Sequence, residues 1–421
     1  MIKRFGFKNL SSFKEGVEIS FEFDGNTPES VSNGKKIGTV LGIKGANGSG
    51  KTNILKALAF LYSFATKRMI THSENDHGVK EIDLPFQSFF YSKEPSEFYV
   101  ELIKDEITYY YELDVTNSGI IRELYVKEED SKEIIFLERI DNKITKCAQD
   151  YEELKSVKLK EDQPLVSLPD DFNFHNDMID LVNLHEEFSL IMFNVGASGM
   201  KIDTKDSTAD TRATFYKANP DALEFVKSVI MSGDEGIHDI EIRTMKTSSG
   251  EDVDYPVFIH KHEGQIYPLI YAHESMGTKV LFNNLHKYWL TLKNGGVLIF
   301  DEFDIHLHSM ILPEVISLFT NVETNPKNAQ LIITAHNTEI IDNLGRYRTI
   351  LVNKDNNASY CYRLDSISML RNDRPISPFY QKGKIGGIPK SVTGLTDRIV
   401  SKLDENKKPS ENESPSESEH G

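Results

Sequence analysis

The chain of 421 residues is 39% hydrophobic, with 24 Phe and 17 Tyr, so its composition excludes a wholly disordered protein and its length predicts two or three lobes. Its formal net charge of −17 argues against a surface that binds duplex nucleic acid throughout, although a local basic groove remains compatible with that charge. Two cysteines, Cys147 and Cys361, are too few for a disulfide framework or a zinc cluster, and no apolar run approaches the ~20 residues that cross a bilayer, which together predict a cytoplasmic protein that does not enter a membrane.

The N-terminal segment alternates apolar and polar residues in two runs. The apolar positions are Ile2, Phe5 and Phe7 in the first run and Val17, Ile19, Phe21 and Phe23 in the second. Such alternation predicts an antiparallel pair of strands. The apolar run 37–43 is then typical of a buried strand, and 53–58 has the pattern of a helix.

A glycine-rich loop connects this buried strand to the helix. It fits the pattern G-x-x-x-x-G-K-[ST] at every fixed position, with the residues Gly45, Ala46, Asn47, Gly48, Ser49, Gly50, Lys51 and Thr52. Glycines let successive N–H groups point at a phosphate, and the following helix adds its positive N-terminal end. In this motif we expect Lys51 to reach the β- and γ-phosphates and the Thr52 hydroxyl to ligate Mg²⁺.

The middle of the chain changes character twice. Alternation returns at 98–104 and 107–115, joined by Asp105-Glu106 as in a hairpin that 120–126 and 134–138 extend. Charge-rich helical patterns such as 177–188 and 220–231 follow, before strands resume at 257–262 and 265–272. These changes predict four parts: an N-terminal lobe with the phosphate loop (1–140), a mostly helical insertion (141–255), a C-terminal lobe (256–400) and a disordered acidic tail (401–421).

Two continuous apolar runs, 297–300 and 331–334, are typical of central parallel strands buried on both faces. The first run ends in Asp301 and Glu302, which gives it the form of a Walker B motif, and ligands of such sheets lie at strand ends. We expect Asp301 to hold Mg²⁺ through its water shell and Glu302 to polarise the attacking water. With Lys51 and Mg²⁺, these acids supply most of what hydrolysis of a nucleoside triphosphate requires.

Three further positions are candidates for the same site. Ser275 and Gly277 stand at the start of an apolar helix pattern, where they form either an anion site or only an N-cap. His336 ends the second apolar run, where it could sense the γ-phosphate or simply terminate a strand. Gln87 is a candidate for sensing Mg²⁺ and the attacking water, although a loop glutamine is common.

Two H-x-H pairs raise the question of a structural metal. They are His260 with His262, on a predicted strand, and His306 with His308, just past Glu302. Alternate strand residues share a face and could share a metal. We favour no metal here, because no cysteine is near and no further ligand completes a familiar set of four.

Together these motifs resemble ATP-binding cassette ATPases of the SMC, RecF and OLD branch, and they are most similar to bacterial abortive-infection ATPases of the AbiL type. The resemblance rests on the opening 7–13, the loop through Asn53, the signature-like 274–279, Asp301-Glu302 with Leu307-His308, and the segments 334–338 and 380–389. It implies an α/β P-loop NTPase fold of the ABC or SMC-head type, with a mixed central sheet, an antiparallel β subdomain and a helical insertion. It also implies ATP as the nucleotide, Asn53 among its contacts and His336 as a switch residue.

The resemblance further implies how the protein works. In such ATPases the signature of one subunit covers the γ-phosphate held by the other, which implies a nucleotide-dependent homodimer or higher oligomer that uses Ser275 and Gly277. Two departures stand out: the signature lacks the second glycine of transporter cassettes, and the 85 residues after His336 are too few for the nuclease domain of OLD proteins. The family likeness therefore implies a sensor or regulator in anti-phage defence that controls a separately encoded toxin or nuclease.

Three other functions stay open at this point. A DNA-repair ATPase of the RecF kind would clamp DNA across the dimer, but the acidic balance counts against it. A cytosolic transporter subunit fits poorly with the strand-rich region after the phosphate loop and with the long insertion. A nucleotide-gated scaffold would bind ATP and barely turn it over, which a turnover measurement distinguishes.

Overall fold

A computed structural model describes residues 1–66, 71–74, 80–83, 87–196, 199–201, 205–305, 311–389, 396 and 399–400. The predicted acidic tail 401–421 and the pair His306 and His308 lie outside these ranges. The chain divides into the units Met1–Gly387 and Ile388–Gly421, and its named helices and strands all belong to the first unit. Within the described ranges, no helix combines the length and the apolar character that crossing a membrane requires.

A six-stranded sheet carries the predicted phosphate-loop strand near its centre. In sheet order its strands are β11 (Ile191–Phe193), β17 (Val297–Phe300), β18 (Gln330–Thr334), β3 (Val40–Gly45), β19 (Thr349–Asp355) and β20 (Ala358–Arg363). The first five strands are parallel and β20 is antiparallel to β19. All residues of β3, β17 and β18 are buried, which confirms the prediction from their continuous apolar runs.

A seven-stranded antiparallel sheet holds most of the remaining N-terminal chain. In sheet order its strands are β10 (Lys143–Cys147), β9 (Lys132–Ile140), β8 (Gly119–Glu129), β7 (Ile107–Thr116), β6 (Ser96–Lys104), β1 (Ile2–Lys8) and β2 (Val17–Ser20). The predicted hairpin is confirmed: Asp105 and Glu106 join β6 to β7 with φ of 49° and 68°. Positive φ at both central residues is the geometry of a two-residue turn that matches strand twist.

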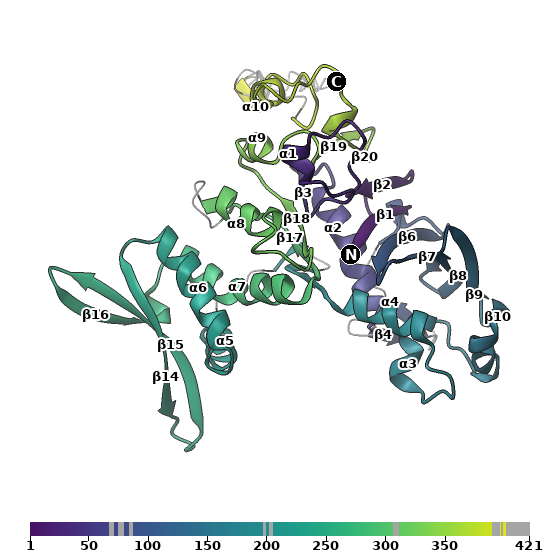
Figure 1. Ribbon diagram of the computed structural model, residues 1–421, viewed down its shortest axis with the longest axis horizontal. Coiled ribbons are helices and arrows are strands. Elements are labelled where there is room, and N and C mark those ends of the chain that lie inside the picture. The colour runs from purple at the N-terminus through teal and green to yellow at the C-terminus, as the bar shows by residue number, and fades with distance from the viewer. Residues whose placement is uncertain are drawn as a thin grey trace, which may run out of the picture. The chain divides into compact units, whose positions relative to one another are not determined.

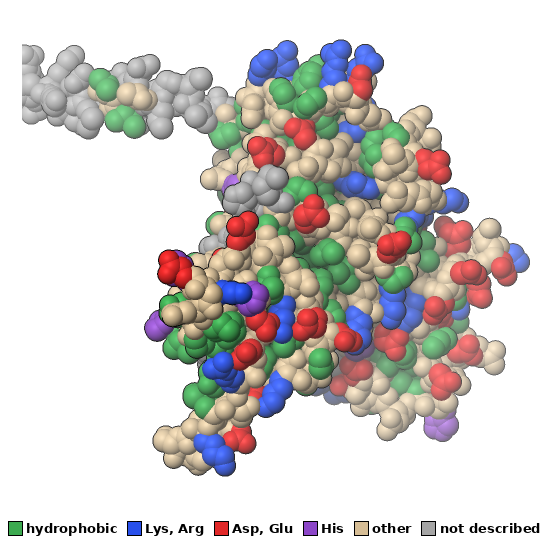
Figure 2. Space-filling view, turned by 60° about the vertical axis from the view of Figure 1, so that its left-hand side comes forward, with side chains coloured by type: hydrophobic (Ala, Val, Ile, Leu, Met, Phe, Trp, Pro, Cys, Tyr) green, Lys and Arg blue, Asp and Glu red, His purple; other side chains and the backbone are tan. Residues whose placement is uncertain are grey.

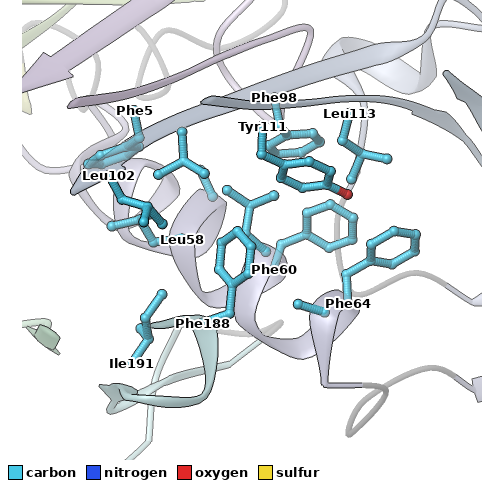
Figure 3. Packing of buried hydrophobic residues seen from close by; sticks show 14 of the residues in the cluster. Phe5, Leu58, Phe60, Phe64, Phe98, Leu102, Tyr111, Leu113, Phe188 and Ile191 are labelled. Carbon is cyan, nitrogen blue, oxygen red and sulfur yellow. The ribbon is translucent and has the colours of Figure 1, made fainter. Parts of the chain in front are cut away.

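Helix α2 (Lys51–Ala65) lies between the two sheets, as Figure 3 shows. The Phe60 ring of this helix lies 4.7 Å from the Phe98 ring of the antiparallel sheet and 5.3 Å from the Phe64 ring. Phe188 and Ile191 belong to the same buried cluster. Each such side chain contributes about 1.5–3 kcal/mol when it leaves water, so this packing fixes the helix that starts at the end of the phosphate loop.

The other face of the central sheet is covered by α7 (Met276–Asn294), α8 (Ile311–Thr320) and α9 (Ile340–Leu344). The Tyr288 ring of α7 lies 5.6 Å from the Phe300 ring of β17 and 6.3 Å from the Phe319 ring of α8. Leu344 of α9 packs so closely on Gly42 that a Cβ there would lie 2.1 Å from Leu344 Cδ1. Helices on both faces of a mostly parallel sheet place this protein in the α/β class, as expected.

The range 141–255, predicted as a mostly helical insertion, occupies three settings in the structure. Helix α4 (Ile179–Ser189) packs on α2 and on the cluster between the sheets, while β11 joins the central sheet beside β17. Helices α5 (Asp206–Ala218) and α6 (Pro220–Gly233) contact α7 instead (Figure 1). The range also carries strand residues, because β14 (Ile237–Lys246) begins well inside it.

Strands β14, β15 (Asp252–His262) and β16 (Gln265–Ile270) form a separate antiparallel sheet. This sheet contacts α5 and α6, and the Phe258 ring lies 5.6 Å from the Phe282 ring of α7. The remaining elements are α1 (Glu29–Ser32), β4 (Thr71–Glu74), β5 (Lys80–Asp83), η1 (Phe89–Tyr91), η2 (Gln149–Ser156), η3 (Leu165–Ser167), α3 (Leu168–Asp171), β12 (Val195–Gly196), β13 (Gly199–Met200), η4 (Tyr271–His273), η5 (Leu364–Ser366) and α10 (Ser377–Gln381).

Candidate functional site

The phosphate-loop sequence lies between the end of β3 and the start of α2. Gly50 precedes α2 with a φ of 110°, and a Cβ at Gly50 would lie 2.8 Å from both Ser12 Oγ and Ser359 Oγ. Only glycine adopts this backbone in that space without strain. The end of the loop next to α2 therefore packs against Ser12 and Ser359, two serines that lie far from it in sequence.

Lys51 is buried and turned toward its own loop. Its ammonium donates hydrogen bonds to the carbonyls of Gly45 at 3.0 Å and Ala46 at 3.1 Å. Burial lowers the Lys51 pKa, and the charges of nearby acids, Asp301 first, oppose that change. A cation held within a phosphate-binding loop is placed to neutralise the anion that such a loop accepts.

Thr52 meets Asp301 across the strand ends. The Thr52 hydroxyl donates a 2.9 Å hydrogen bond to Asp301 Oδ2, and the Thr334 hydroxyl donates a 2.5 Å hydrogen bond to Asp301 Oδ1. The Asp301 backbone is held as well, because Asn194 Oδ1 accepts from its N–H at 2.7 Å and Asn194 Nδ2 donates to its carbonyl at 3.0 Å. The two proposed magnesium ligands are thus adjacent, and Asp301 is fixed at both its side chain and its main chain.

Glu302 has a left-handed backbone with a φ of 51°. Its N–H donates a 2.8 Å hydrogen bond to the Thr334 hydroxyl, which holds this uncommon conformation in place. Its Oε1 lies 3.9 Å from His336 Nε2, and both side chains are partly exposed. Strained residues persist where surrounding contacts require them, and they cluster at functional sites.

The backbone of His336 is held from both sides. Its N–H donates to the Asp304 carboxylate at 2.8 Å, as does the N–H of Asn337. Its carbonyl accepts from Lys44 Nζ, which also donates to the Ala335 carbonyl at 3.2 Å. Burial lowers the Lys44 pKa to about 8, with Asp304 opposing the change. Lys44 and Asp304 therefore position the loop that carries the histidine.

Asn53 contacts the N-terminal segment of the chain. Its Nδ2 donates to Ser12 Oγ at 2.9 Å. Ser359 Oγ donates to the Ser49 carbonyl at 2.6 Å and lies within hydrogen-bond distance, 2.7 Å, of Ser12 Oγ. These bonds tie the loop to the opening segment and to β20. They give Asn53 a role in the shape of the loop, while a direct contact with nucleotide stays a prediction.

Gln87 lies beside the opening segment as well. Its carbonyl accepts a 2.6 Å hydrogen bond from the N–H of Ser11, and the residue is exposed. The structure therefore brings its main chain near Ser12. It does not record a side-chain hydrogen bond for Gln87 within the ranges that it describes.

The signature-like residues stand apart from this cluster. Ser275 caps α7, its Oγ accepting from the Thr278 N–H at 3.1 Å, and Met276 is 53% exposed. The Glu274 Oε1 atom accepts a 2.8 Å hydrogen bond from His260 Nε2 of β15. In the described part of the chain no hydrogen bond or ion pair links Ser275 or Gly277 to the phosphate loop or to Asp301.

Sequence reasoning missed four residues that support this site: Asn194, Thr334, Asp304 and Lys44. Asp304 and Lys44 have weak local signals, since one follows the Walker B pair closely and the other immediately precedes the loop. Asn194 has none, because it lies in the range predicted as an insertion. Thr334 belongs to a predicted strand, and only the fold shows that its hydroxyl serves both acids.

The residues present fit a magnesium-bound nucleoside triphosphate. The buried Ser49 hydroxyl of the loop has no hydrogen-bond partner within the described ranges, so a polar group is missing at that point. The Thr52 hydroxyl and the Asp301 carboxylate are oxygen ligands of the kind that Mg²⁺ prefers. Among the described residues no group of three or more His, Cys, Asp and Glu side chains could hold a metal ion by itself, and His260 bonds to Glu274.

A comparison with protein families finds one match over more than half of the chain. The family model described as "AAA domain, putative AbiEii toxin, Type IV TA system" matches residues 40–342. This range includes the phosphate loop, Ser275, Asp301, Glu302 and His336. No curated protein matches the chain.

Three solved structures of Smc head domains are similar to this chain. An SmcHead bound to the C-winged helix domain of ScpA is 14% identical, with a TM-score of 0.44 over 88% of this chain and 99% of that one. A Pyrococcus furiosus Smc head with an extended coiled coil, bound to the C-terminal domain of ScpA, is 13% identical, with a TM-score of 0.41 over 87% and 97%. A Pyrococcus yayanosii Smc head with a coiled coil and joint is 10% identical, with a TM-score of 0.42 over 90% and 99%.

Proposed function

Because the chain belongs to the family of AAA domains described as putative AbiEii toxin of a type IV toxin–antitoxin system, we propose that it binds ATP with Mg²⁺ and hydrolyses the ATP. One arrangement carries this proposal, the meeting of these side chains at neighbouring strand ends. The Thr52 hydroxyl lies 2.9 Å from Asp301 Oδ2, and Glu302 Oε1 lies 3.9 Å from His336 Nε2. Phosphoryl transfer to water needs a phosphate-binding loop, a metal ligand and a carboxylate that can reach the attacking water.

Each of these side chains has its own task. Lys51 neutralises phosphate charge, and its burial strengthens that interaction by excluding water. Thr52 and Asp301 hold Mg²⁺, which when bound neutralises the charge on the β- and γ-phosphate oxygens. Glu302 orients and polarises the attacking water, and His336, held by Asp304 and Lys44, lies within reach of the same region. Gln87 remains a candidate for contact with the metal or the water.

We further propose that ATP joins two copies of this chain. Ser275 and the half-buried Gly277 stand at the exposed start of α7, where the helix end favours an anion. Their own copy does not bring them to its phosphate loop in the described ranges, so a second copy would present them to the nucleotide. Homodimerisation is then controlled by ATP binding and released by hydrolysis.

The biological role that we propose is nucleotide-dependent control of a separate effector in anti-phage defence. The family description refers to a toxin–antitoxin system, and the sequence resembles abortive-infection ATPases of the AbiL type. Clamping of DNA is less favoured, because Lys and Arg side chains alternate with Asp and Glu over the face in Figure 2. The partner is therefore expected to be a protein toxin or nuclease.

Two variants test the ATPase proposal. Lys51→Ala should abolish nucleotide binding, and Glu302→Gln should bind ATP but turn it over at least about 100-fold more slowly, because only the water-activating group is lost. Light scattering should then find Glu302→Gln as an ATP-bound dimer. If both variants hydrolyse ATP like the parent protein, or if the Glu302→Gln protein stays monomeric with ATP, the corresponding part of the proposal is wrong.

The defence role needs its own experiment. Cells that carry the native gene neighbourhood should resist phage, and cells with Lys51→Ala in the same neighbourhood should not, as counted by plaques. Co-purification with the wild-type and Glu302→Gln proteins should recover the effector. Equal plaque counts for the wild-type and Lys51→Ala cells would rule out a nucleotide-dependent role in defence and leave the ATPase assignment untouched.

A further inference from the structure

A cavity of about 470 Å³ lies at the opposite edge of the central sheet from the phosphate loop. Four arginines are among its lining residues: Arg346 and Arg348 before β19, and Arg371 and Arg374 before α10. Because β19 runs parallel to β3, residues that precede β19 lie at the edge away from the loop that follows β3. The arginines are notable in a chain with a net charge of −17.

The guanidinium of Arg348 lacks a compensating charge in the described part of the chain. It donates one hydrogen bond, to the Val31 carbonyl, and its Nε is buried without an acceptor. Burial lowers the Arg348 pKa, and no described carboxylate opposes the change. Arg348 is half-buried, and a cation that is partly removed from water without a paired charge is destabilised, so an anion bound here would be favoured.

Arg346 forms one wall of this cavity. Its guanidinium donates to the carbonyls of Leu370, Asp365 and Ile367, so the segment before α10 is held in place. Arg374 lies on that segment and is exposed, with no ion pair recorded among the described residues. Arg371 pairs with Asp373 at 3.2 Å. Arg346 therefore holds the wall of the cavity by three hydrogen bonds, while the Arg374 side chain at the rim is exposed.

The charges of the lining favour a particular anion. Asp342 directs its carboxylate to the N–H groups of Ile376 and Ser377 at the start of α10, and Asp373 is paired. These two acids offset half of the arginine charge, which leaves two positive charges. A phosphate monoester carries a charge of about −1.5 to −2 at pH 7, and the guanidinium fork matches its oxygens. In Figure 2, Lys and Arg side chains gather at the height where Figure 1 draws α10.

We propose that this cavity is a second ligand site, which binds a small molecule bearing a phosphate monoester through Arg348 at its base and Arg374 at its rim. Its volume falls within the range of about 300–1,000 Å³ that holds small ligands. The site is linked to the phosphate-loop strand, because the Gly42 N–H of β3 donates a 2.7 Å hydrogen bond to the Arg348 carbonyl. The ligand is distinct from the ATP of the proposed function and does not depend on it.

Calorimetric titration of the full chain with ribose 5-phosphate tests this site. The Lys51→Ala variant serves as the parent, so that the phosphate loop does not compete for the ligand. We expect saturable binding of ribose 5-phosphate and none of ribose, which lacks the phosphate. Arg348→Gln and Arg374→Gln should each weaken binding at least about tenfold, since each removes a charge-assisted hydrogen bond.

The controls separate this site from general charge effects. Arg243→Gln removes an equally positive side chain from β14, where it pairs with Glu241 at 2.7 Å, and should leave the affinity unchanged. Arg374 is exposed, so its variant reports on binding even if Arg348→Gln does not fold. Three outcomes would each overturn the proposal. They are the absence of saturable binding up to about 10 mM ribose 5-phosphate, an affinity that is unchanged in both cavity variants, and an equal affinity for sulfate.

Discussion

Replacement of Lys44 by methionine is expected to affect ATP turnover and, separately, the free energy of unfolding. Lys44 donates hydrogen bonds to the carbonyls of Ala335 and His336. We expect Lys44→Met to slow ATP turnover, because these bonds no longer hold the backbone that carries His336. Methionine keeps the length and apolar stem of the side chain. ATP affinity should change little, since Lys51 and the phosphate loop remain intact.

The magnitude follows from two opposing terms. The decrease in pKa from 10.5 to about 8 corresponds to about 3 kcal/mol for keeping Lys44 charged in its buried position below pH 8. Its two charge-assisted hydrogen bonds contribute about 1.5–3 kcal/mol each, so removing the charge and the bonds together lowers the free energy of unfolding by about 0–3 kcal/mol. Turnover should nevertheless fall about tenfold or more, as expected for about 1.4 kcal/mol of lost transition-state stabilisation.

The pH dependence gives a second signature. Because the folded pKa of Lys44 lies below its unfolded value, the unfolded chain binds more protons between about pH 8 and 10.5, and Lys44 makes the protein more stable as the pH rises through this window. Turnover shows the opposite trend: the parent should lose activity above about pH 8 as Lys44 loses its charge, and Lys44→Met should lack this alkaline limb.

Steady-state ATP turnover from pH 6 to 10, with chemical denaturation at pH 7, measures both effects. Lys35→Met is the matched control, since Lys35 is also partly buried but bonds Asn328 at 2.7 Å before β18, away from the phosphate loop. Lys44→Met turnover equal to the parent at every pH would refute the positioning role of Lys44. A similar loss of turnover in Lys35→Met would show that the effect is not specific to the position of Lys44.

Three other predictions concern separate parts of the molecule. Asn194→Ala should raise the Mg²⁺ concentration needed for half-maximal turnover and cost about 1–3 kcal/mol of stability, because it releases the Asp301 main chain; a Mg²⁺ titration with an unchanged midpoint would contradict this. Gly50→Ala should abolish nucleotide binding measured by calorimetry, whereas Gly250→Ala, also at positive φ but with open space around it, should cost stability alone. Arg139→Ala should lower the free energy of unfolding by about 3–5 kcal/mol, since it leaves the Glu123 carboxylate, 0% exposed and 3.3 Å away, without its cationic partner; a loss below about 1 kcal/mol in denaturation experiments would show that the buried pair is not needed.

The fold was predictable where its signals are local in sequence. Strand β3, the phosphate loop and α2 follow from an apolar run, a glycine motif and a helical pattern that stand side by side in the chain. Strand β11 gives no such signal, because it has only three residues and its burial arises from pairing with β17, which lies about a hundred residues later. This is why the range 141–255 could be predicted as an insertion although part of it completes the central sheet.

The candidate site shows the same division. Lys51, Thr52, Asp301 and Glu302 belong to motifs whose spacing predicts their chemistry, and the parallel strands bring them to one edge. The residues that hold them were not predictable, because a bond such as that from Thr334 to Asp301 depends on tertiary structure. Their roles in turnover, like those of Ser275 and His336, stay predictions that the proposed variants test.

The two hydrogen bonds from the Asn194 side chain to the Asp301 main chain have a consequence for regulation. Asn194 directly follows β11, and α5, which comes later in the chain, packs on α7 and on β15. Both Asn194 bonds reach the Asp301 main chain, so a displacement of Asn194 is expected to shift the proposed metal ligand. A partner that moved the segment around Asn194 would thus be expected to alter metal binding without touching the nucleotide.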